Sequence, residues 1–261
     1  MKSLLKFTLP LALFFMMVYT SCRKAEKAPA STSTTTAVND TAASQIAVNL
    51  ASSLDGSYGG SNANDAVDSV SFDENHDGPH HGKPSSTLCG FFTDSLVNYT
   101  TTCDAFKSHT GGNLTFYFNC KDGRPDGYKA YDSLNTVGIA KKYSFQNMVK
   151  QAYFIQCLDD EHTFNGVNGD IYTYVAINCF DKSVKPNIAT GNYVLCNLVI
   201  DLKKHDIISG TATFHAFGSN NYGSWSLSGS MVFLGDHKAK VTIGDKWWII
   251  DITSGQICSH S

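Results

Sequence analysis

The residues best suited to chemistry lie in a short acidic stretch between positions 73 and 78. Asp73, Asn75 and Asp77 carry side-chain oxygens at alternate positions, and Gly78 follows them. Hard cations such as Ca²⁺ prefer carboxylate and amide oxygens, and glycine permits the sharp turn that a binding loop needs. The stretch therefore predicts a calcium site, while the same residue types are also ordinary loop formers.

This hexapeptide resembles the first half of the calcium-loop family written D-x-[DN]-x-[DN]-G, and the resemblance implies coordination of calcium by its oxygens. Three histidines, His76, His80 and His81, lie in the stretch or just after it. Imidazole binds zinc and copper, so these histidines with Asp77 predict a second metal site, for zinc or copper. The alternative is weak chelation by a flexible surface loop.

Tryptophans near the C-terminus form the second group of candidates. Trp225, Trp247 and Trp248, together with Tyr172, Tyr174 and Phe233, could offer aromatic platforms to a sugar or a lipid. Neighbouring residues of a strand point to opposite faces, so Trp247 and Trp248 cannot both enter the core of a regular strand. One of the two must be exposed, covered by another element, or lining a pocket.

Catalytic patterns are weak. The chain contains no G-x-S-x-G, H-E-x-x-H, Walker or dinucleotide motif. The cluster of three acids and a histidine at residues 159–162 is typical of a hairpin turn, whereas a glycan- or lipid-acting hydrolase would need carboxylates from separate strands to converge. We therefore predict a non-enzymatic protein, with a secreted hydrolase as the alternative.

The N-terminus has the pattern of an export signal. Lys2 and Lys6 precede an apolar run from Phe7 to Val18, and small residues lead to Cys22. This segment resembles a lipoprotein signal peptide, which implies that residues 1–21 are removed and that Cys22 carries palmitate-type lipid. Arg23 and Lys24 are not the Asp-type signal for inner-membrane retention, so we expect anchoring to the outer membrane of the cell envelope.

The mature chain would be mildly acidic. Removing residues 1–21 takes away two lysines, so 18 basic residues face 23 acidic ones and the net charge is −5. Such a charge predicts no nucleic-acid partner. The partners we expect are the membrane, through the lipid, and a small-molecule, glycan or envelope-protein ligand.

Eight cysteines in an exported chain are candidates for disulfides. The pairs that short loops or a hairpin could bring together are Cys89 with Cys120 or Cys103, and Cys179 with Cys196. The alternative is that isolated cysteines in apolar strands are small buried side chains.

Asp-Ser/Thr-hydrophobic tripeptides occur four times in the chain. They match the acceptor of an O-glycosylation system of some exported Gram-negative proteins. Thr41 and Ser69 lie in the segments that we expect to be most accessible, and they are the predicted acceptors.

The remaining pattern predicts a mainly β fold. Residues 22–38 form a small, polar tether, residues 39–56 a short amphipathic helix, and residues 57–86 a Gly/Asp/His-rich loop. From residue 87 to 261, short alternating segments follow one another without helical windows, which predicts an antiparallel meander closing as a β-sandwich or barrel. The clearest segment is Tyr193 to Leu202, where Val194, Cys196, Leu198, Ile200 and Leu202 would share one face.

Over most of its length the chain resembles a group of Gram-negative lipoproteins. The shared motifs are an I-A-x-x-L helix (Ile46–Leu50), an L-x-G-x-Y-G-G end (Leu54–Gly60), Cys89-Gly90, Cys120 and Asp126-Gly127-Tyr128. The resemblance implies an outer-membrane type lipoprotein with an all-β C-terminal domain and supplies no activity. We therefore expect a lipid-anchored envelope protein whose β domain binds a ligand or has a structural role, with a metal-binding lipoprotein as a further alternative.

Overall fold

The computed structural model describes residues 33–58, 60–64, 70–72, 79–81, 89–159, 161, 163–221 and 223–261. Side chains are described for all of these except residues 33–38, 70–72, 79–81 and 124.

One antiparallel sheet of eleven strands makes up the body of the protein, so the predicted mainly β meander is confirmed. Every strand pairs with its neighbours in sequence, and β3 and β13 form the two edges. The strands are β3 (Phe92–Thr102), β4 (Phe106–Lys121), β5 (Arg124–Ala140), β6 (Tyr143–Cys157), β7 (Phe164–Cys179), β8 (Asn187–Asp201), β9 (Asp206–Asn220), β10 (Gly223–Gly235), β11 (Lys238–Ile243), β12 (Lys246–Asp251) and β13 (Ile257–His260). Two short strands, β1 (Val70–Phe72) and β2 (Pro79–His81), pair separately within the predicted loop.

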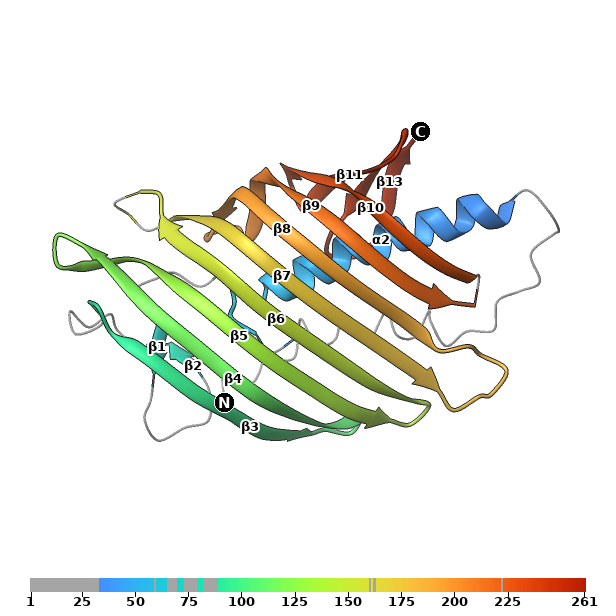
Figure 1. Ribbon diagram of the computed structural model, residues 1–261, viewed down its shortest axis with the longest axis horizontal. Coiled ribbons are helices and arrows are strands. Elements are labelled where there is room, and N and C mark those ends of the chain that lie inside the picture. The colour runs from blue at the N-terminus through green and yellow to red at the C-terminus, as the bar shows by residue number, and fades with distance from the viewer. Residues whose placement is uncertain are drawn as a thin grey trace.

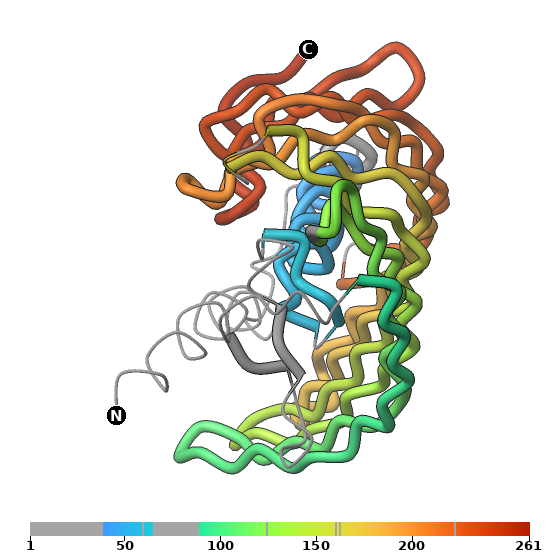
Figure 2. Tube along the Cα trace, turned by 90° about the vertical axis from the view of Figure 1, so that its left-hand side faces the viewer, coloured from blue at the N-terminus to red at the C-terminus, as the bar shows by residue number. Residues whose placement is uncertain are grey.

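The sheet curves strongly but does not close into a barrel. Helix α2 (Ser33–Leu54) lies in the trough that the concave face forms (Figures 1 and 2). A sheet must bury its apolar face against another element, and here the helix supplies that element. The predicted closure into a barrel is therefore replaced by a curved sheet wrapped around a helix.

Helix α2 is longer and more deeply buried than the sequence indicates. It begins at Ser33, within the predicted tether, rather than near Asn39. Instead of one apolar stripe, nine of the residues from position 42 to 54 are buried, and the helix contacts β7, β8 and β10 to β12. Small alanines at positions 42, 43 and 47 let the curved sheet approach the helix from several sides.

Hydrogen bonds also hold helix α2 against the concave face of the sheet. The Tyr193 hydroxyl donates to the carbonyl of Ile46 at 3.1 Å, and Trp248 Nε1 donates to Asp40 Oδ1 at 2.7 Å. At the other side, Ser44 Oγ donates to the carbonyl of Gly255 at 2.6 Å. These bonds tie the helix to strands β8 and β12 and to the segment before β13.

A β-bulge in β8 places its side chains on two different faces, so the single face predicted for them is wrong. The pairing with β9 shifts register between Cys196 and Val199, and Asn197 adopts a positive φ of 51°. Val194 and Cys196 are therefore exposed on the outer face, while Leu198 and Ile200 are buried on the inner face. Since side chains alternate strictly along a regular strand, one extra residue moves the rest to the opposite face.

Among the described residues, no helix has the combination of length and apolar character that crossing a bilayer requires.

Candidate functional site

The three tryptophans do not form a common surface. Trp225 and Trp248 are buried in the core, and the Trp248 indole is bonded to the helix as described above. Trp247 points outward and is half-buried, with Lys240 Nζ 5.1 Å from its ring centroid. The predicted tryptophan ligand surface is thus wrong for Trp225 and Trp248, because the concave trough takes up their large apolar area. Phe233 is likewise in the core.

The metal candidates stay predictions. Asp73, Asn75, His76 and Asp77 lie outside the described residues. His80 and His81 belong to β2, whose side chains are not described. Within the part of the chain that the structure describes, no group of three or more His, Cys, Asp or Glu side chains could hold a metal ion.

Of the two predicted disulfides, the structure forms one and not the other. Cys89 is joined to Cys120 with a Cα–Cα distance of 5.4 Å, while Cys103 is an exposed free thiol. The Cys179–Cys196 pair is not formed, because Cys196 is an exposed free thiol and Cys179 is bonded elsewhere. The register of the β7–β8 hairpin explains this result: Ile177 pairs with Asn187 and Gly169 with Leu195, so the two cysteines lie toward opposite ends of the hairpin.

The predicted modification sites are only partly within the described residues. Thr41 is exposed on helix α2, and Ser69 and Cys22 lie outside the described residues.

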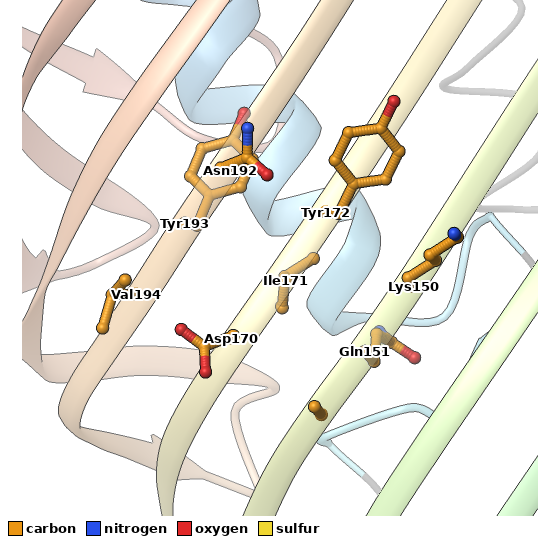
Figure 3. A pocket seen from close by; sticks show the side chains of 9 residues that line it. Lys150, Gln151, Asp170, Ile171, Tyr172, Asn192, Tyr193 and Val194 are labelled. Carbon is orange, nitrogen blue, oxygen red and sulfur yellow. The ribbon is translucent and has the colours of Figure 1, made fainter.

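A shallow hollow on the outer, convex face of the sheet is the best candidate for a binding site. It has a volume of about 230 Å³ and lies over the middle of β6, β7 and β8. Figure 3 shows the side chains that line it, with helix α2 behind the sheet. The lining residues are Lys150, Gln151, Ala152, Asp170, Ile171, Tyr172, Asn192, Tyr193 and Val194.

The register of the strands arranges the outward-facing lining residues in two rows of three. Lys150 pairs with Tyr172, and Tyr172 with Asn192; in the next row Ala152 pairs with Asp170, and Asp170 with Val194. Directly opposite residues lie about 4.5–5.5 Å apart at Cβ, so these side chains surround one small area. The short side chain of Ala152 leaves room that its longer neighbours enclose.

The hollow brings together groups of complementary chemistry. Tyr172 supplies an aromatic ring, Asn192 a carboxamide that both donates and accepts, Asp170 an acceptor and Lys150 a donor. Asp170, Asn192 and Lys150 are exposed, so their hydrogen-bonding atoms are accessible from solvent. The arrangement can bind a small ligand that has both an apolar face and several hydroxyl groups.

The strands beneath the hollow are held from behind by the helix. Gln151 Nε2 donates to the carbonyl of Ser53 at 2.7 Å, and the Tyr193 hydroxyl reaches Ile46. Gln151 and Tyr193 alternate with the outward residues on β6 and β8, so inner contacts fix the outer side chains in place. A hollow supported in this way is largely preformed.

A second group of polar side chains is buried on the inner face, where the segment after the helix meets β5 and β6. The carboxylate of Asp132 accepts from the backbone N–H of Ser61 at 2.7 Å and from the Ser61 hydroxyl. Gln151 Oε1 accepts from the same N–H at 2.9 Å, and the Tyr153 hydroxyl donates to the Ser61 carbonyl at 2.7 Å. Burial raises the pKa of Asp132 to about 6, opposed by the bonds from Ser61. These contacts are inaccessible and hold the chain in place rather than form a site.

Sequence reasoning singled out Tyr172 but not its partners. Lys150, Asp170 and Asn192 are polar residues at alternate positions of strands, which is also what any solvent-facing side of a sheet contains. Only the pairing register shows that they are neighbours, so no local signal distinguishes them.

Comparisons with protein-family models, with curated proteins and with solved structures give no match to this chain.

Proposed function

We propose that this protein is a lipid-anchored protein of the cell envelope whose β domain binds a saccharide in the outer-face hollow without transforming it. The observation that carries this proposal is the meeting of Tyr172, Asn192, Asp170 and Lys150 around one exposed hollow. A sugar ring has an apolar face of C–H groups and a rim of hydroxyls. An aromatic ring suits the first, and amide, carboxylate and ammonium groups suit the second.

The composition of the hollow favours binding over hydrolysis. Cleavage of a glycosidic bond commonly uses two carboxyl groups about 5–9 Å apart. The lining contains one carboxylate, Asp170. Asp201 and Asp206 pair at the ends of β8 and β9, but both carboxylates bind backbone N–H groups of turns. Asp201 accepts from Lys203 N–H at 3.0 Å, and Asp206 accepts from His237 N–H at 3.0 Å.

The anchor rests on the sequence pattern that ends at Cys22. Ten residues, 23–32, separate this cysteine from the first residue of helix α2, so the lipid and the folded body would be joined by a short stretch of chain. Lipidation consumes the thiol of Cys22, so a lipidated Cys22 cannot take part in a disulfide.

Metabolic labelling with a palmitate analogue tests the anchor. We expect the label on the purified protein and its loss in a Cys22→Ser variant. Peptide mass spectrometry without reduction should show a diacylglyceryl thioether at Cys22. A disulfide at Cys22 in the protein isolated from the envelope would contradict the anchor.

Ligand-observed NMR on the mature chain tests the binding site. The probes are glucose, galactose, xylose and N-acetylglucosamine, and we expect saturation transfer to at least one of them. The transfer should fall strongly in Asn192→Ala and Asp170→Ala. A Lys182→Ala variant, which changes an exposed residue in the β7–β8 connection, is the matched control. Absence of transfer to all four sugars would contradict the proposal.

A further inference from the structure

We propose that the outer face of the sheet carries a diagonal row of three aromatic side chains, Tyr131, Tyr172 and Phe217, that binds an extended, neutral polysaccharide. This inference rests on the proposed function and deepens it, because Tyr172 lies in the hollow and the two other rings lie on either side of it. We call these three residues the aromatic diagonal.

The strand register places the three rings at successive levels of the sheet. Tyr131 on β5 lies opposite Ala152, and the pairing continues through Asp170 and Val194, which defines the first level. Tyr172 lies two residues further along β7 and defines the second level.

The third level follows in the same way. Tyr174, two residues beyond Tyr172, pairs with Thr190, and Thr190 pairs with Phe217 on β9. From Tyr131 to Tyr172 and from Tyr172 to Phe217, the step is therefore the same: two strands across and two residues along. The register is continuous through these positions, because the bulges of β7 and β8 lie beyond them.

This repeated step fixes the spacing of the rings. Two interstrand distances of about 4.8 Å and two residues of about 3.3 Å each combine to about 12 Å. Such a spacing is longer than a single sugar ring. A linear chain lying along the diagonal could thus rest alternate rings on successive aromatic side chains.

The two outer aromatic side chains are exposed to solvent. The residue Tyr131 is 52 % exposed and Phe217 is 46 % exposed, and both lie on the face that is turned away from helix α2. Aromatic side chains normally bury a large area when they stabilise a core. Their repeated exposure along one line favours a binding role over a packing role.

Polar side chains lie between the rings. Asp170 and Lys150 lie between Tyr131 and Tyr172, and Asn192 and His215 lie between Tyr172 and Phe217. His215 Nδ1 is 2.8 Å from Ser228 Oγ, which orients the imidazole on the outer face. These groups can bind the hydroxyls of the intervening sugars.

The charge along the diagonal favours a neutral ligand. Lys150 and Asp170 contribute one charge of each sign, so no excess of positive charge would attract a polyanionic glycan.

Isothermal titration calorimetry on the mature chain tests the inference. The probes are three linear hexasaccharides, cellohexaose, xylohexaose and laminarihexaose, and the disaccharide of each series. We expect at least one hexasaccharide to bind ten or more times as tightly as its disaccharide, because only the longer chain reaches all three rings.

Variants of the diagonal locate the ligand. Tyr131→Ala and Phe217→Ala should each weaken hexasaccharide binding at least fivefold and leave disaccharide binding within twofold. Tyr172→Ala should weaken both. Phe180→Ala is the matched control, since Phe180 is an aromatic residue exposed to 52 % in the β7–β8 connection. Unchanged melting temperatures show that the variants are folded.

Three outcomes overturn the inference in distinguishable ways. Saccharide binding that depends on Asn192 but does not strengthen with chain length would leave the proposed function intact and refute the diagonal. No binding to sugars of any length would refute both. Concentration-dependent dimerisation that Tyr131→Ala and Phe217→Ala abolish would assign the diagonal to contact between two copies of the chain.

Discussion

The carboxylate of Asp132, on strand β5, accepts a 2.7 Å hydrogen bond from the backbone N–H of Ser61, 71 residues earlier in the chain. A second bond comes from the Ser61 hydroxyl, while the other carboxylate oxygen, Oδ1, is buried without a hydrogen-bond partner. The segment that follows helix α2 is thereby fixed to the inner face of the sheet by an acid that would be charged in water at neutral pH.

This acid makes stability depend on pH. Burial raises the pKa of Asp132 from 3.8 to about 6, so between these values the folded protein binds a proton that the unfolded chain has released. The stabilisation that this bound proton gives is fully present below pH 3.8 and is lost as the pH rises through 6. The free energy of unfolding should fall by about 3 kcal/mol over this range. Asp132→Asn should remove this dependence and stabilise the protein at pH 7.5, because the amide oxygen still accepts from Ser61.

Urea unfolding from pH 4 to 7.5 measures the effect. Asp55→Asn is the control: Asp55 is an exposed acid, so solvent screening should leave a smaller change. Equal pH profiles for Asp132→Asn and the unsubstituted protein would contradict the prediction.

The indole of Trp248 should be a main stabilising contact between the sheet and helix α2. Trp248→Phe removes its bond to Asp40 and part of a fully buried side chain, so we expect a loss of about 1–3 kcal/mol in the free energy of unfolding. The adjacent Trp247→Phe changes a half-buried ring on the outer face and should stay within about 0.5 kcal/mol. Similar losses for both variants would show that the bond to the helix is not the cause.

Gly169 should tolerate no side chain. Its φ is 141°, and a Cβ there would lie 2.3 Å from the carbonyl oxygen of Ala152. Gly169→Ala is expected to cost about 2 kcal/mol or more, because backbone strain and overlap add.

Gly111→Ala provides the comparison for this substitution. A Cβ at Gly111 meets nothing closer than 3.7 Å and its φ is not positive, so this variant should be nearly as stable as the unsubstituted protein. Thermal unfolding of both variants is the measurement, and equal melting temperatures for Gly169→Ala and Gly111→Ala would contradict the predicted strain and overlap at Gly169.

The Cys89–Cys120 disulfide should stabilise the start of the sheet. It closes a loop with a sequence separation of 31 residues. The chain-entropy relation for such a loop gives about 3–4 kcal/mol, so Cys89→Ala with Cys120→Ala should lower the melting temperature substantially. Cys196→Ser, which changes an exposed free thiol, should not. Equal melting temperatures for the two proteins would contradict this contribution.

The local patterns of the chain were sufficient for the antiparallel meander and for the existence of a helix near residues 39–54. Alternating apolar residues require a two-faced strand, and strands that follow one another without crossovers pair with their neighbours. The sequence also offered Cys120 and Cys103 as partners for Cys89, and the structure shows the pair with Cys120.

The faces of particular side chains depended on tertiary contacts. In β8, Asn197 bulges against Gly210 of the neighbouring strand, where a Cβ would meet the Asn197 carbonyl oxygen at 2.4 Å. This bulge places Val194 outside and Leu198 inside, contrary to strict alternation. Likewise, the face of β12 that contacts helix α2 decided that Trp248 is buried and that Trp247 lies half-buried on the outer face.

The sequence by itself determined the strand order, because pairing between successive strands is a local matter of chain length and periodicity. Only the tertiary structure decided that the sheet stays open around a buried helix and that Lys150, Tyr172 and Asn192 are neighbours. Curvature, register and the partners of each face arise from contacts between residues far apart in the chain, and no window of the sequence contains them.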